Sequence, residues 1–315
     1  MRPLTFGILT SQLPPHEALS PGVDHRSARD LAAVLGRMGH HAPILRADDD
    51  LDLTLRHSGV DACLLALHGR RGSRGDIQAL LQMRGLPFDG PCGTAAATAF
   101  DKVQSRQLLA YHNLPVPVAV ALGPGRRADE RALELLGWPC VVKPRRGAHG
   151  EGISLLESAQ GVRAAIEHAL EIDHEVILER AVEGRELQVV LLGERVLGIA
   201  EVRRPLGGEI MEMCCPAPLS RGRRDGVENL ARQAVRALGL GTGPTRVDIV
   251  LHPRHNEMIL EVEPLPPLHR EGVVARVAHA AGLGYDALVS RLVDPLLLHS
   301  ARWSSSPSAS ASMLQ

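Results

Sequence analysis

The sequence contains almost no lysine. Of its 315 residues only Lys102 and Lys143 are lysine, whereas 33 are arginine. Lysine is normally among the commonest residues, so the two that remain are expected where arginine cannot replace them. An ammonium group is a compact point charge, whereas a guanidinium group is a wide planar fork. Because a narrow site for phosphate oxygens favours the point charge, we interpret both lysines as phosphate-binding residues of a nucleotide site. Two ordinary surface lysines are the alternative.

Other scarcities exclude whole classes of partner. Aromatic residues make up only 2% of the chain, which leaves few surfaces on which nucleic acid bases could stack. The net charge of -1 at pH 7 provides no general attraction to nucleic acid or to an anionic membrane. No apolar stretch approaches the ~20 residues that cross a bilayer. The apolar run at 4–9 is too short for a signal peptide and predicts a first strand.

Cysteine is scarce as well. The five cysteines are an odd number and form no CxxC motif, which favours buried, reduced thiols over a disulfide framework or a zinc site. These absences predict a cytoplasmic protein that binds neither nucleic acid nor membranes. Its expected partners are small-molecule substrates and, among proteins, at most a second copy of the chain in a homodimer.

Strand-like runs alternate with helical stretches along most of the chain. This rhythm predicts the α/β fold class and a small parallel α/β domain over residues 1–100. A second block covers 101–184 and a third covers 185–300, so three α/β blocks are expected. The segment 301–315 is rich in Ser and Ala and predicts a disordered tail.

A glycine-rich loop follows the strand that ends in Lys143. It carries Gly147, Gly150 and Gly152 within six residues, and backbone N–H groups in such a loop can approach phosphate oxygens closely. The loop is not a P-loop, because the lysine precedes the glycines and no GK[ST] follows. Together with the lysine, the loop supports the nucleotide interpretation.

Two acids lie on either side of the next turn. Glu179 ends one predicted strand and Glu186 begins another. This arrangement suits a purine nucleoside, with backbone groups of the turn meeting the adenine edge and Glu186 accepting from ribose hydroxyls. On this segment alone, an ordinary charged connection between strands is the simpler interpretation.

Three carboxylates are predicted to meet on one hairpin, formed by strands at 246–252 and 257–263. Alternation along a strand places Glu261 and Glu263 on the same face, and Asp248 can join them. Three carboxylates in an apolar sheet repel one another unless a cation lies between them. Oxygen ligands suit Mg²⁺, or Mn²⁺ in its place, and Arg246 on the same face is predicted to stabilise an anionic transition state. A solvated sheet face is the alternative.

A fourth segment, 67–75, combines His68 with glycines and three arginines. Its position between a strand and a helix allows it to hold a carboxylate or phosphate, although a lone histidine is more often structural.

In this order the segments resemble the D-alanine–D-alanine ligases of the ATP-grasp superfamily, from Leu4 to about Leu298. The resemblance implies an N-terminal domain followed by a two-lobed ATP-grasp fold, with ATP between the second and third blocks. It also implies a role for each matching residue. The residues implied for phosphate, adenine and ribose are Lys102, Lys143, Gly150, Glu179, Arg180, Val182 and Glu186. The residues implied for magnesium are Asp248, Glu261 and Glu263.

Departures from the family concentrate at the amino-acid end of the site. Pro15 falls where a carboxylate should hold the ammonium of the first substrate, and Glu17 is its expected replacement. The mobile lid is reduced to 205–208, which predicts an acylphosphate exposed to water. Glu263 replaces the usual asparagine, and Pro267 removes an N–H from the oxyanion hole.

Three functions therefore remain open. The first is a D-alanine–D-alanine ligase-type enzyme that forms an acylphosphate from ATP and serves peptidoglycan precursor synthesis. The second is an ATP-grasp ligase that joins other amino-acid substrates. The third is a nucleotide-binding protein without ligase activity.

Overall fold

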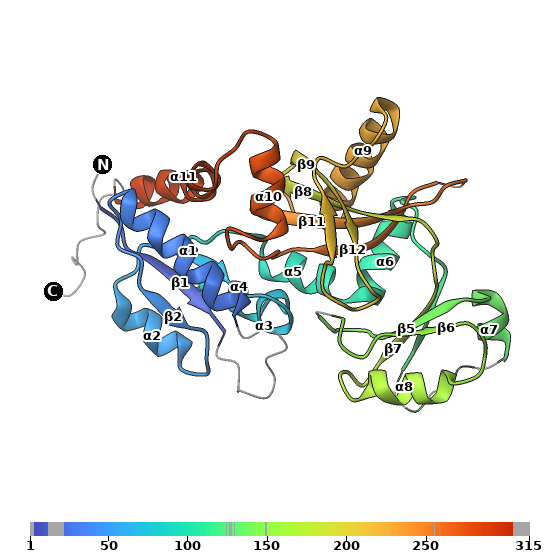
Figure 1. Cartoon of the computed structure of the whole chain (residues 1–315). Helices are drawn as coiled ribbons and strands as arrows, with labels where there is room; N and C mark the ends of the chain where they lie inside the picture. Colours follow the sequence, from blue (N-terminus) through green and yellow to red (C-terminus); the bar gives the residue numbers. More distant parts are fainter. Residues whose placement is uncertain are drawn as a thin grey trace.

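The computed structural model describes residues 3–11, 22–123, 125, 128, 130–148, 150–254 and 256–304. Within these residues the strands form three separate sheets of three, four and five strands. Figure 1 shows the sheets one after another across the molecule, with helices packed on each. The predicted α/β fold class is confirmed, whereas the domain limits drawn from the sequence stay a prediction.

The first sheet is parallel, in the order β2-β1-β3. Both β1 and β3 are apolar and buried along their whole length, as expected for parallel strands covered on both faces. The helix α1 buries Leu31 and Leu35 against them. The elements of this region are β1 (Phe6–Thr10), α1 (Val23–Arg37), β2 (Ile44–Arg46), α2 (Leu51–Ser58), β3 (Ala62–Ala66), α3 (Arg70–Ser73) and α4 (Asp76–Met83).

The second sheet is antiparallel, in the order β4-β7-β5-β6. Alternation gives its strands two unlike faces, one of which packs Val142 and Leu178 against α8. The other face carries Lys143 and Glu179, which are still buried. The elements are β4 (Ala119–Leu122), α7 (Glu130–Leu136), β5 (Cys140–Pro144), β6 (Ser154–Leu156), α8 (Val162–Leu170) and β7 (Val176–Arg180).

The third sheet is antiparallel, in the order β10-β9-β8-β11-β12. One face packs Val189 and Val247 against α9 in a core that also includes residues of α5 and α6. The opposite face carries the charged residues of the hairpin. The elements are α5 (Gly93–Phe100), α6 (Lys102–Tyr111), β8 (Arg185–Leu192), β9 (Arg195–Arg203), β10 (Glu212–Cys214), α9 (Arg221–Ala237), β11 (Pro244–Leu251) and β12 (Met258–Glu263).

The last two helices run back across the molecule. The helix α10 (Val273–Ala280) packs on β9, and α11 (Tyr285–Ser304) contributes Leu288 and Leu292 to the same core as α1, as Figure 1 shows. Because α11 continues to Ser304, the first four residues of the expected tail are helical. Residues 305–315 lie outside the described part of the chain.

Several elements differ from those predicted. The short helices α2 and α5 and the three-residue strands β2, β6 and β10 have too few periodic residues to be recognised in the sequence. Residues 85–88 contribute one isolated bridge, between Phe88 and Cys63. All five cysteines are free, but Cys92 and Cys214 are exposed rather than buried. In the described residues no helix is both long and apolar enough to cross a membrane.

Candidate active site

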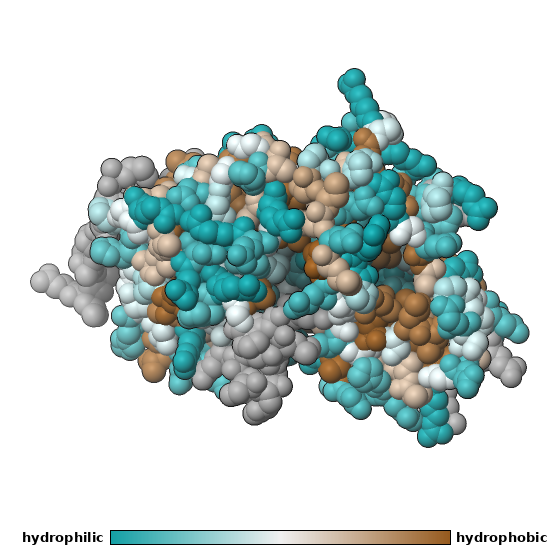
Figure 2. Space-filling model, in the orientation of Figure 1, coloured by the Kyte–Doolittle hydropathy of each residue, from teal (hydrophilic) through white to brown (hydrophobic). Residues whose placement is uncertain are grey.

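A pocket of about 430 Å³ lies between the second and third sheets, a size typical of small-molecule sites. One wall comes from β5 and β7, the other from β8, β11 and β12, and His68 and Leu265 lie at one end. Leu155 and Leu206 line the pocket and are about half exposed. Figure 2 shows hydrophobic residues gathered over the region of β5, β6 and β7 on the visible face. A rimmed apolar surface of this kind suits the flat face of a ligand.

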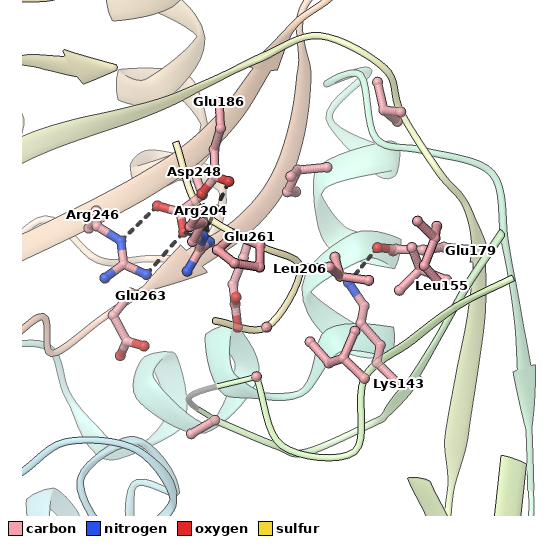
Figure 3. Close-up of a pocket in the computed structure, with 18 of the residues that line it drawn as sticks. Lys143, Leu155, Glu179, Glu186, Arg204, Leu206, Arg246, Asp248, Glu261 and Glu263 are labelled. Carbon is pink, nitrogen blue, oxygen red and sulfur yellow. Dashed lines mark hydrogen bonds and ion pairs between the residues drawn. The ribbon is translucent and has the colours of Figure 1, made fainter. Parts of the chain in front are cut away.

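Lys143 points into this pocket from β5 (Figure 3). Its Nζ donates to Oε1 of Glu179 at 2.5 Å, and Oε2 of Glu179 accepts from Arg106 Nη1 at 2.9 Å. All three side chains are buried. The carboxylate expected near adenine is therefore shared by two cations, one of which, Arg106, was not recognised in the sequence.

Lys102 reaches the same region from the first turn of α6. Its Nζ donates to the carbonyl oxygen of Gly147 at 2.8 Å and lies 3.4 Å from Oε1 of Glu261. The helix begins here because Asp101 caps it, accepting from the backbone N–H groups of the next turn. Asp101 also accepts from Arg145 at 2.7 Å, which fixes the glycine-rich loop against α6. Both lysines of the chain thus meet beside this loop.

The opposite wall carries alternating charges (Figure 3). Arg246 donates to both oxygens of Asp248 at 2.7 and 3.0 Å. Arg204 donates to both oxygens of Glu186 and lies 3.7 Å from Asp248. Burial and the neighbouring Asp248 raise the pKa of Glu186. The expected face of repelling carboxylates is in fact interleaved with arginines.

The pairing of β11 with β12 brings the charged residues of the hairpin next to one another. Asp248 pairs with Glu261 and Arg246 with Glu263, and an extra residue follows, since Ile249 pairs with Ile259. This bulge leaves Leu260 unpaired, and both Leu260 and Glu261 line the pocket. Bulges commonly redirect side chains beside functional sites.

The two glutamates of β12 have opposite electrostatic surroundings. Removal from bulk water acts to raise the pKa of Glu261, but Lys102, Lys143 and Arg246 lower it to about 2. Burial raises the pKa of Glu263 to about 7, although Arg246 acts in the opposite direction. Oε1 of Glu263 accepts two long hydrogen bonds, from Ser73 Oγ and from the Leu265 backbone N, each at 3.3 Å. Of the two, Glu263 is the carboxylate that lacks close cationic compensation.

Two loops that line the pocket touch each other through glycines. Gly150 and Gly207 both have positive φ, and a Cβ added to Gly150 would lie 2.1 Å from the Gly207 carbonyl oxygen. The shortened segment 205–208 therefore touches the glycine-rich loop directly, and the exposure of an acylphosphate to water stays a prediction.

We expect Gly150→Ala to push these two loops apart, because the new Cβ overlaps backbone atoms that cannot rotate away. The variant should hydrolyse ATP with less product formed per phosphate released. Separate assays of phosphate and ligated product measure this ratio. Gly222→Ala is the matched control, since a Cβ at Gly222 meets nothing within 4 Å. Unchanged coupling in Gly150→Ala would contradict a sealing role for the contact.

The comparisons with known proteins agree with this arrangement. The family model for the D-ala D-ala ligase C-terminus matches residues 122–294. The D-alanine–D-alanine ligase of Gloeobacter violaceus is 31% identical over 282 residues, covering 85% of this chain and 92% of its own. The chain belongs to the D-alanine–D-alanine ligase family.

Other relatives extend the similarity. The D-alanine–D-alanine ligase of Chromohalobacter salexigens is 33% identical over 243 residues, which is 74% of this chain and 77% of that one. The crystal structure of the Bacillus anthracis D-alanine–D-alanine ligase complexed with ATP superimposes with a TM-score of 0.84. It covers 95% of this chain and 99% of its own at 22% identity. This structural likeness shows the shared fold.

The residues predicted for adenine do not all face the pocket in the same way. Val182 lines it, and Arg180 lines its edge. However, the Arg180 guanidinium donates to the carbonyl oxygens of Leu135 and Leu136 at the end of α7. This side chain caps a helix, so we expect any contribution of Arg180 to a ligand to come from its backbone.

At the substrate end of this family site, Glu17 lies outside the described residues. His68 is buried, with Nε2 3.1 Å from Ser27 Oγ and Nδ1 3.1 Å from the Leu265 carbonyl oxygen. Its Nε2 is also 3.8 Å from a carboxylate oxygen of Asp24, another buried residue. The sequence analysis missed Asp24, which lies in an acidic first turn of α1 and could have been recognised there.

The donor set fits a magnesium ion in its chemistry. Asp248, Glu261 and Glu263 supply oxygen atoms on neighbouring strand positions. Burial raises the pKa of Glu263, and Arg246 offsets this only in part. Arg246 bonds both oxygens of Asp248, and no ready-made group of three such side chains for a metal ion is found in the described residues. A metal that arrives with ATP would therefore exchange with the arginine contacts.

Proposed function

We propose that this protein is an ATP-dependent ligase that phosphorylates a carboxylate and joins the resulting acylphosphate to an amine. The observation that supports it most directly is the meeting of the only two lysines at one glycine-rich loop beside the pocket. Point-charge donors at such a loop suit the phosphates of ATP. The family relationship supports the same chemistry.

The chain's own residues supply positioning and charge neutralisation, which account for most catalysis of phosphoryl transfer. Lys102 and Lys143 would hold the phosphates, and Glu186 would accept from the ribose hydroxyls. Arg246 donates two of its five N–H groups to Asp248. Its remaining N–H groups can stabilise developing negative charge. A divalent ion held by Asp248, Glu261 and Glu263 would supply further charge neutralisation, with Mg²⁺ preferred and Mn²⁺ as a substitute.

The amino-acid substrates are proposed at the level of their class. Pro267 lines the pocket and has no N–H for an oxyanion, which predicts slow acyl transfer to any amine. The second candidate is a ligase for amino acids other than D-alanine, and Pro15 in place of the carboxylate for the first ammonium favours it. We further propose that the protein works in the cytoplasm in peptidoglycan precursor synthesis. A homodimer stays a prediction.

Binding and turnover test the proposal separately. We expect MgATP at about 100 times its dissociation constant to add about 2.7 kcal/mol to the unfolding free energy, which a thermal melt detects. Phosphate and dipeptide are then measured with D-alanine and with a panel of D- and L-amino acids. Matched phosphate and D-alanyl-D-alanine would establish the first candidate, and coupling with another amino acid the second. A bound nucleotide without either product would contradict ligase activity.

A further inference from the structure

Arg106 is a buried cation that the site described above leaves without a role. It lies on α6, one helical turn after Lys102, and is 9% exposed. It does not line the pocket but contacts Glu179, which does. Among the described residues it pairs with Glu179, whose Oε2 lies 2.9 Å from its Nη1. A buried charge survives only with such compensation, so its placement calls for an explanation.

The balance of charges around Glu179 explains why Arg106 is buried at this position. Without Arg106, the buried Lys143 and Glu179 would form a closed pair at 2.5 Å with no net charge. Two charges at that separation attract strongly away from water, and the lysine would have little attraction left for phosphate. With Arg106 on the second oxygen of the carboxylate, the trio carries one net positive charge.

Arginine is well suited to neutralise the buried Glu179 carboxylate. Arginine keeps its charge when buried, whereas a buried lysine readily loses its proton. Burial does act to lower the pKa of Arg106, but Glu179 acts to raise it. Because Lys102 and Arg106 are four residues apart, one face of α6 delivers both cations to the same site. The helix therefore carries one direct phosphate donor and one indirect one.

We propose that Arg106 is a positioning residue of the ATP site, which neutralises Glu179 so that Lys143 remains free to bind the nucleotide phosphates. This inference rests on the proposed function, since it assumes that ATP occupies the pocket. Arg106 should therefore affect the binding of the phosphates and not of the adenosine part, because it acts on the nucleotide through Glu179 and Lys143.

The test compares ATP with adenosine, which lacks phosphates, by equilibrium binding. Arg106→Gln should lower the affinity for ATP about tenfold, or about 1.4 kcal/mol, and change the affinity for adenosine less than about twofold. Arg106→Lys places an ammonium beside Glu179, which favours its charged form, so this variant should retain more ATP affinity than Arg106→Gln. The exposed Arg163 on α8 provides the matched control, and Arg163→Gln should change neither affinity.

The variant Glu179→Gln in the Arg106→Gln background completes the cycle. Removing both charges releases Lys143 again, so the ratio of ATP to adenosine affinity should return toward that of the parent. Using the ratio cancels any effect of Glu179 on adenine. Arg106→Gln alone leaves Lys143 and Glu179 paired with each other, whereas the double variant leaves the buried Lys143 without its carboxylate. If the double variant fails to fold, the comparison of Arg106→Gln with Arg106→Lys still tests the inference.

Three results would overturn the inference. Equal losses of ATP and adenosine affinity in Arg106→Gln would show that Arg106 merely supports the fold of the lobe. Unchanged affinity for both ligands, or no recovery in the double variant, would show that Glu179 does not compete for Lys143. If the parent protein binds no ATP, the proposed function fails instead, and the two failures are thereby distinguished.

Discussion

Lys143→Arg should lower the affinity for ATP about 10- to 100-fold, although it conserves the charge and the rest of the chain uses arginine. Lys143 is buried, and its Nζ already lies 2.5 Å from Glu179. A guanidinium there would pair with the carboxylate through two parallel hydrogen bonds. Its larger head would also occupy space that the phosphates need. The loss should be measured by equilibrium binding of ATP in the presence of magnesium.

The companion variant Lys102→Arg tests the same argument at the second position. Lys102 is also buried, between the Gly147 carbonyl oxygen and Glu261. The reverse exchange, Arg163→Lys on the exposed surface of α8, is the control and should have no effect. If both lysine variants bind ATP as tightly as the parent, the scarcity of lysine has no functional meaning, and the argument from composition is wrong.

The sheet faces of the site could be predicted from the sequence because they follow from alternation over short distances. The hairpin was predicted from two apolar runs joined by a short loop, and its pairing of Asp248 with Glu261 follows from that geometry. The lysine at the end of β5 and the loop behind it were likewise neighbours in sequence. Local patterns of this kind carry most of the information needed to place the carboxylates and Lys143.

The cations that balance those carboxylates could not be predicted in the same way. Arg106 is 73 residues from Glu179 in the sequence, and helical periodicity does not say which strand a helix face will meet. Arg204 precedes the shortened lid and reaches Glu186 only because β8 and β9 pair. The sequence analysis counted the acids of two strands without the arginines of their neighbours, and so expected a repulsive face.

The contribution of α11 to the N-terminal core was missed for a related reason. Its apolar residues predict a helix but not a partner, and Leu292 packs with α1 across more than 250 positions of the chain. Similarly, the segment 205–208 looks too short to cover a site when counted in residues. It nevertheless contacts the glycine-rich loop, because Gly207 allows the backbone to approach Gly150 closely.

The opposite surroundings of Glu261 and Glu263 lead to the second prediction, that their glutamine variants change stability in opposite directions. In metal-free protein the pKa of Glu263 is about 7, above the value near 4.3 of an unfolded chain. The folded state therefore binds the extra proton, and stability contributed by Glu263 falls as the pH rises from about 4.3 to about 7. Glu263→Gln removes this loss and should make the metal-free protein more stable than the parent at pH 8.

Glu261 has the reverse sign, because its pKa is lowered to about 2. Its contribution is present above the unfolded value and is lost as the pH falls from about 4.3 towards 2. Glu261→Gln should therefore destabilise the metal-free protein at pH 7 by about 1 kcal/mol, a modest value because the side chain is 37% exposed and water screens its partners.

Denaturant unfolding of both variants with a chelator present, at pH 5 and pH 8, measures these effects. Glu157→Gln, at an exposed position before α8, removes a carboxylate far from the hairpin and is the control for a simple change of net charge. Both hairpin variants should also lose most ATP turnover, since each removes an anionic oxygen ligand. Thus Glu263→Gln should gain stability while it loses activity, and Glu261→Gln should lose both. Two variants of equal stability across this pH range would show that the lysines and arginines do not distinguish the two carboxylates.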